Sequence, residues 1–195
     1  MRTLIVAAVA CLAIGCGSDS RSAPTVPVDD TQDDTIDSVL LRMALVVDDV
    51  EASKDFYSHV LGYTVGFDGD ITRPAVIEQL QLAKGQTAHF VVLRGADSVD
   101  GRELNGAMVG LLHIDNPPLP AMQRPGPATL ATGEGMMAIV TSDIATVYAR
   151  AQELDARILL PPMKSADGSE SEMVVYDPDG VRIHVVEVHT PRPTD

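Results

Sequence analysis

Two stretches of the chain show the same order of hydrophobic and polar positions. "MALVVDDVEASKDFYSHVLGYTV" begins at Met43, and "MAIVTSDIATVYARAQELDARIL" begins at Met137, 94 residues later. In each stretch a short aliphatic run typical of a strand is followed by an Asp, Asp49 or Asp143, and then by apolar residues at helical spacing. Asp is a favoured N-cap because its carboxylate accepts hydrogen bonds from first-turn N–H groups. The pattern therefore predicts the same strand and helix start twice.

Each predicted helix is followed by three segments with the composition of strands. After the first helix these are residues 63–67, 89–94 and 108–113, with a short helix near 76–83; after the second they are 157–159, 173–176 and 183–188. Gly62 stands where the first helix should end in a left-handed cap. The Pro- and Gly-rich residues 115–135 join the two halves. The sequence therefore predicts an α+β fold of two βαβββ modules, residues 39–115 and 135–190.

The N-terminal residues 1–16 have the layout of a signal peptide, with one basic residue and an apolar run too short to span a bilayer comfortably. Their end, "AIGC", resembles a bacterial lipobox, which implies cleavage before Cys16 and a lipid on that cysteine. One alternative is a lipobox at "AVAC", ending at Cys11; others are an uncleaved anchor and a plain secretory peptide. All of these export the protein. We expect a lipid-anchored protein of the bacterial envelope, with Gly17 favouring the periplasmic side of the outer membrane.

Charge narrows the range of partners. The chain of 195 residues has 28 acidic and 14 basic residues, a formal net charge of -14. Such an excess of negative charge argues against nucleic acid or an anionic bilayer surface as a partner. Residues 17–38 are rich in Ser, Thr, Asp and Pro and are expected to form a disordered acidic tether. Both cysteines precede this tether, so the predicted domain, residues 39–190, has no disulfide.

Several stretches of the sequence resemble the glyoxalase/bleomycin-resistance/extradiol-dioxygenase superfamily, which has the vicinal oxygen chelate (VOC) fold. They are the first repeat from Met43, "HFVVLRG" together with "MVGLLHIDNP", and "VVYDPDGVRIHVVEV". The resemblance covers about residues 39–188. It implies that the two modules curl into a half-barrel and that metal-using members carry ligands on the first and last strands of each module. These positions fall here on Arg42, His113, Met136 and His184. Modules of this kind can pair within one chain or between chains, so a homodimer is possible.

Alternation of side chains along each strand is consistent with these four residues facing one concave pocket, if the modules pair as the resemblance implies. His113 and His184 are candidate metal ligands. A catalytic zinc or iron normally has at least three protein ligands, however, and Arg42 would place a permanent positive charge beside the ion. A third ligand would have to come from a loop. We therefore expect no resident cofactor, with a divalent metal as the alternative.

The sequence favours a binding function for this pocket. A guanidinium from Arg42 and two imidazoles, with Met136 in the wall, suit a small organic anion. The first alternative is a metal-dependent lyase or dioxygenase of the glyoxalase or extradiol type, for which no catalytic residue is assigned; its glyoxalase version needs glutathione, a cytosolic thiol, which fits poorly with export. The second alternative is an interaction protein of the envelope with a vestigial pocket.

Overall fold

The computed structural model describes residues 40–104, 106–120, 122, 130 and 132–189, all within one compact unit, Val39–Asp195. The expected signal peptide with Cys16 and the expected tether, residues 17–38, lie outside the described residues. Within the part of the chain that is described, no helix is long and apolar enough to cross a membrane.

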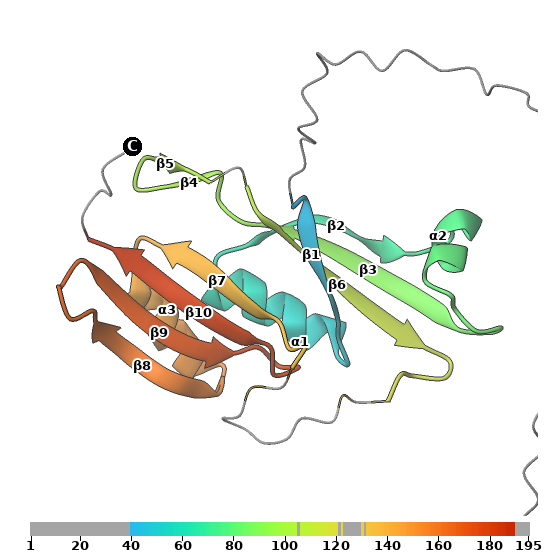
Figure 1. Ribbon diagram of the computed structural model, residues 1–195. Coiled ribbons are helices and arrows are strands. Elements are labelled where there is room, and N and C mark those ends of the chain that lie inside the picture. Colours follow the sequence, from blue (N-terminus) through green and yellow to red (C-terminus); the bar gives the residue numbers. More distant parts are fainter. Residues whose placement is uncertain (1–39, 105, 121, 123–129, 131, 190–195) are drawn as a thin grey trace, which may run out of the picture. The chain divides into compact units, whose positions relative to one another are not determined.

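The two halves of the domain repeat one arrangement (Figure 1). The first half consists of β1 (Arg42–Val46), α1 (Val50–Asp55), its π-helical continuation η1 (Phe56–Val60), β2 (Thr64–Asp70), α2 (Pro74–Gln79), β3 (Thr87–Arg94), the small hairpin of β4 (Ser98–Val99) and β5 (Arg102–Glu103), and β6 (Met108–Asp115). The second consists of β7 (Met136–Thr141), α3 (Ile144–Glu153), β8 (Ile158–Lys164), β9 (Glu170–Tyr176) and β10 (Arg182–Val188). The strand orders are β1-β6-β3-β2 and β7-β10-β9-β8, and in each sheet the first strand pairs parallel with the last. The predicted α+β fold with two βαβββ modules is confirmed.

Both helices begin at the predicted aspartates. The Asp49 carboxylate accepts hydrogen bonds from the N–H groups of Glu51 and Ala52, both at 3.0 Å. The Asp143 carboxylate accepts from the N–H of Thr146 at 2.9 Å. The first helix ends at Gly62, as predicted, because its φ of 72° is a left-handed conformation in which glycine carries no steric penalty.

We expect Asp49→Ala to lower the free energy of unfolding by about 1 kcal/mol, because two N–H groups at the start of α1 lose their acceptor. Asp49→Asn keeps a side-chain oxygen in the same place and should cost much less. Urea denaturation of the parent and both variants measures the difference. Identical denaturation midpoints for the parent and Asp49→Ala would show that the Asp49 cap contributes nothing to stability.

Two features of the strands differ from the sequence-based expectation. The strand expected at residues 157–159 continues through Pro161 and Pro162 as β8, because β8 lies at the edge of its sheet, where a missing N–H breaks no ladder. The β4–β5 hairpin was not predicted. Its turn, Asp100-Gly101, has φ values of 50° and 76°, and the Asp-Gly pair is a known signal for such a turn.

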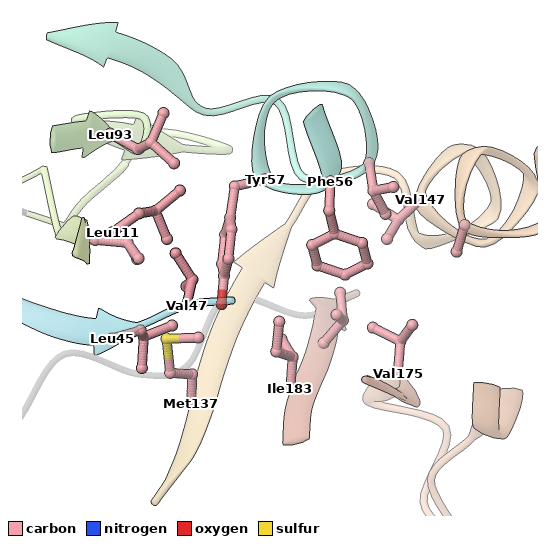
Figure 2. Packing of buried hydrophobic residues seen from close by; sticks show 14 of the residues in the cluster. Leu45, Val47, Phe56, Tyr57, Leu93, Leu111, Met137, Val147, Val175 and Ile183 are labelled. Carbon is pink, nitrogen blue, oxygen red and sulfur yellow. The ribbon is translucent and has the colours of Figure 1, made fainter. Parts of the chain in front are cut away.

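One hydrophobic core joins the two modules. Leu45 and Leu111 of the first sheet share it with Val147 of α3 and Ile183 of β10. Figure 2 shows Tyr57 of η1 between the side chains of the two halves. Tyr57 is completely buried, and the modules therefore pair within one chain.

Hydrogen bonds connect the "DPDG" turn before β10, which belongs to the second module, to the first module around α1. The Asp177 carboxylate accepts a hydrogen bond from the Tyr57 hydroxyl at 3.0 Å. The Asp179 carboxylate accepts from the Asp48 N–H at 2.7 Å and from the buried Ser53 hydroxyl at 2.8 Å. These bonds fix the turn against the end of β1, where a cavity lies.

Candidate functional site

A cavity of about 620 Å³ lies beside β1. Its walls come from four separate stretches of the chain: β1 and the residues after it, the end of β6, both ends of the linker, and the "DPDG" turn. The lining residues are Met43, Ala44, Leu45, Val46, Val47, Asp48, His113, Ile114, Leu119, Pro120, Met122, Gly133, Glu134, Gly135, Pro178, Asp179 and Val181.

The charged groups among the described lining residues of this cavity are carboxylates. Asp48 follows β1, Glu134 precedes β7, and Asp179 belongs to the "DPDG" turn. None of the described lining residues is Lys or Arg. The formal charge of the described lining residues is therefore negative, and the remaining described walls are mostly apolar.

His113 brings a hydrogen-bond acceptor to the cavity. Its Nδ1 lies 3.2 Å from the carbonyl oxygen of Val47; a carbonyl can only accept, so Nδ1 carries the proton. The Nε2 lone pair makes no hydrogen bond within the described part of the chain. His89, directly opposite on β3, contacts Asp70 at 2.8 Å and Asp68 at 2.7 Å through its two ring nitrogens. The hydrogen bond with Asp70 raises the pKa of His89, and the bond with Asp68 adds to the rise, although burial opposes it.

A buried carboxyl group supports the cavity wall from behind. Asp177 precedes the lining residue Pro178 and is almost completely buried. Burial raises the pKa of Asp177 to about 6, although hydrogen bonds from the Val181 N–H and the Tyr57 hydroxyl oppose the rise. The turn that forms this wall is therefore sensitive to pH.

The four residues expected to share one pocket do not all come together. His113 lines the cavity, whereas Arg42, Met136 and His184 do not. His113 lies on the same face of its strand as Leu111, which enters the core toward α1. Arg42 lies on the opposite face of the sheet, with its guanidinium 5.3 Å from the ring centre of Phe90. The structure therefore places Arg42 and His113 on opposite faces of their sheet, because alternation along a strand does not tell which face the helix covers.

Met136 and His184 lie on the second sheet, on its face away from α3. Ile183 and Val185 enter the core, so the alternating residue His184 points to the other side of β10. Its Nε2 lies 3.0 Å from a carboxylate oxygen of Glu172 on β9. Met136 is at the start of β7 and is exposed.

Sequence reasoning did not assign Asp48, Glu134 and Asp179 to a site. Each stands in a loop directly before or after a strand, and the three are far apart along the chain. One signal was available: the same "DPDG" motif that carries the family resemblance contains Asp179, and its turn residues must lie at a strand end.

The side chains of the described residues do not fit a catalytic metal. No group of three His, Cys, Asp or Glu side chains in that part of the chain could hold an ion. His184 and Glu172 offer two potential ligands, and His113 has Val47 as its neighbour rather than a carboxylate. Since a catalytic divalent metal usually needs three protein ligands, we derive no metal-dependent step.

Comparison with known proteins places this geometry in a family. The family model for the Glyoxalase/Bleomycin resistance protein/Dioxygenase superfamily matches residues 36–185. A glyoxalase family protein from Bacillus cereus superposes with a TM-score of 0.63 at 16% identity, over 79% of this chain and 98% of that chain. A glyoxalase I variant from Zea mays gives 0.51 at 19% identity, over 78% of this chain and 47% of that one. Glyoxalase I from Leishmania major gives 0.50 at 20% identity, over 77% and 87%.

No curated protein matches the sequence. These three solved structures are 20% identical to this chain or less, and they therefore establish the fold. The family model covers well over half of the chain. The chain belongs to the Glyoxalase/Bleomycin resistance protein/Dioxygenase superfamily.

Proposed function

We propose that the domain is a binding module that holds a small organic cation with an apolar body in the cavity beside β1. The observation that carries this proposal is the lining: three carboxylates from three separate segments, and no basic side chain among the described lining residues. A positively charged group in this cavity would be attracted by these carboxylates.

The apolar walls suit the rest of such a ligand. Met43, Leu45 and Met122 offer flexible and branched aliphatic surface, and small-molecule sites are mostly apolar with a few convergent polar groups. His113 adds an imidazole whose Nδ1 is held by the carbonyl oxygen of Val47. An organic anion, which the sequence favoured, would meet three carboxylates here, and the cavity gives that expectation no support.

Binding of two dyes of opposite charge tests the proposal. Tetramethylrhodamine ethyl ester and fluorescein share a xanthene core, but the first is a cation and the second an anion. We expect saturable binding of the rhodamine ester, measured by fluorescence anisotropy, and no saturable binding of fluorescein. Added salt should weaken the binding, because opposite charges at a partly open site are screened.

Substitutions that remove one cavity charge should weaken binding of the cationic dye. We expect Asp48→Asn and Glu134→Gln each to raise its Kd roughly two- to fivefold, the effect of one partly solvated charge pair. Asp100→Asn is the matched control: it removes one negative charge from the β4–β5 turn, outside the cavity, and Asn tolerates the positive φ there. Equal weakening in all three variants would mean that the dye responds only to the net charge of the protein.

We also propose that the protein is exported and tethered to the bacterial envelope by a lipid on Cys16, on the support of "AIGC" after an apolar run of suitable length. Cys16→Ser should abolish incorporation of labelled palmitate in the producing bacterium. Cys11→Ser, the matched control, should leave incorporation unchanged. Continued labelling of the Cys16→Ser protein would contradict the lipid anchor.

A further inference from the structure

A second cavity, of about 320 Å³, lies where segments of both modules meet. Its walls come from residues 61–63 after η1, residues 95–96 after β3, the segment that carries the β4–β5 hairpin, and residues 138–142 at β7. None of its described lining residues is charged, and none of them lines the cavity beside β1. A charged ligand would lose hydration here without gaining a counter-charge from the described walls, so this lining favours an uncharged ligand.

Tyr63 brings a hydroxyl group to the wall of this cavity. A Cβ atom at position 95 would lie 3.1 Å from Tyr63 Cζ, the ring carbon that bears the hydroxyl. Since Gly95 and Tyr63 both line the cavity, the hydroxyl end of the ring belongs to its wall. Tyr63 is half-buried, and its hydroxyl makes no hydrogen bond within the described part of the chain. Burial raises the pKa of the Tyr63 hydroxyl, so it keeps its proton at neutral pH and can donate it.

Thr141 supplies a second hydroxyl from the end of β7. Its Oγ1 accepts a hydrogen bond from the Asp143 N–H at 3.2 Å, which leaves the hydroxyl proton available for donation. The walls around the two hydroxyls include the aliphatic side chains of Leu61 and Leu104. The cavity therefore combines apolar walls with two O–H donors, a combination typical of sites for small molecules.

We propose that this cavity binds an uncharged, mostly apolar molecule of about one ring whose carbonyl oxygen accepts a hydrogen bond from the Tyr63 hydroxyl, with Thr141 as a second donor. A carbonyl oxygen can only accept, so it complements a hydroxyl that still has a proton to donate. Pockets for small molecules usually span about 300 to 1,000 Å³, so this one suits a ligand at the small end of that range. The site depends neither on the proposed organic cation nor on a metal.

Fluorine NMR with three probes of similar size tests this site. The ketone para-fluoroacetophenone has the uncharged carbonyl, para-fluoroethylbenzene lacks it, and para-fluorobenzoate carries a negative charge in its place. On titration with the full-length protein, we expect the ketone to bind most tightly and the benzoate to show no saturable binding. Tyr63→Phe should raise the Kd of the ketone about two- to tenfold, the effect of one hydrogen bond between uncharged groups, and leave that of para-fluoroethylbenzene unchanged.

Tyr148→Phe is the matched control, because the Tyr148 hydroxyl lies outside this cavity and accepts a hydrogen bond from the Gln152 side chain at 3.3 Å on α3. This variant should bind the ketone like the parent. Thr141→Val should weaken ketone binding at least about twofold, and it keeps the test valid if Tyr63→Phe folds poorly.

The proposal is overturned if the ketone shows no saturable binding, or if the benzoate binds as tightly as the ketone. It is also overturned if Tyr63→Phe weakens ketone binding no more than Tyr148→Phe does. The cationic dye reports on the cavity beside β1, and Tyr63→Phe should leave its Kd unchanged. A loss of ketone binding with unchanged dye binding therefore separates this site from the proposed function.

Discussion

Asp177→Asn is expected to remove a pH dependence of about 3 kcal/mol from the stability of the domain. The pKa of Asp177 is about 6 in the folded protein, above the ordinary Asp value of 3.8 that applies in the unfolded chain. The folded state therefore binds this proton more tightly, and the resulting stabilisation is fully present below about pH 3.8 and lost as the pH rises through about 6. A rise of this size in one pKa corresponds to about 3 kcal/mol. Asparagine has the same shape and no charge, so its contribution does not change over this range.

Urea denaturation at about pH 4 and about pH 7.5 measures this effect as the difference between parent and variant at each pH. We expect the variant to gain about 3 kcal/mol relative to the parent on going to the higher pH. Asp100→Asn, which alters an exposed turn, should show the parent's pH dependence. Parallel curves for parent and Asp177→Asn would show that the Asp177 carboxyl ionises alike in the folded and unfolded states.

Phe56→Ala is expected to lower the free energy of unfolding by about 3 to 5 kcal/mol, the usual cost of truncating a fully buried phenylalanine. Phe56 is 2% exposed and packs edge-on against Tyr57, with ring centres 5.4 Å apart. Both side chains belong to the core shared by the two modules, so the cavity left by Phe56 weakens the contact between them.

Phe67→Ala provides the comparison for this effect. It deletes the same atoms, but Phe67 lies on β2 and is 51% exposed, and we expect a loss of about 1 kcal/mol or less. The denaturant midpoints of Phe56→Ala and Phe67→Ala, each compared with the parent, measure the two losses of stability. Similar losses at the two positions would contradict the shared core, since exposure would then have no influence on the cost.

The repeated pattern of the sequence was enough to predict the modules. Asp49, Asp143 and Gly62 mark helix ends through local chemistry, and the alternation around Ile183 and Val185 depends only on neighbours along the strand. Such features can be read from the sequence because their causes lie within a few residues. The path of β8 through Pro161 could not be read in this way, because it depends on the strand's place at the edge of its sheet.

The site was harder to predict because its residues meet through tertiary packing. His113 and Arg42 belong to strands whose alternation was read correctly, but α1 covers the face that carries His113. The three carboxylates of the cavity come from loops more than 40 residues apart along the chain, and only the fold brings them to one place.

Methyl NMR of the protein labelled at its methionines tests the central claim most directly. Met43 and Met122 line the cavity, Met163 is similarly exposed on β8, and Met173 is buried in the core. On titration with tetramethylrhodamine ethyl ester, a cation bound beside β1 should shift the Met43 and Met122 signals along one saturation curve and leave Met163 and Met173 unchanged. Saturable shifts at Met163, with Met43 and Met122 unmoved, would place the ligand elsewhere and contradict the proposed function.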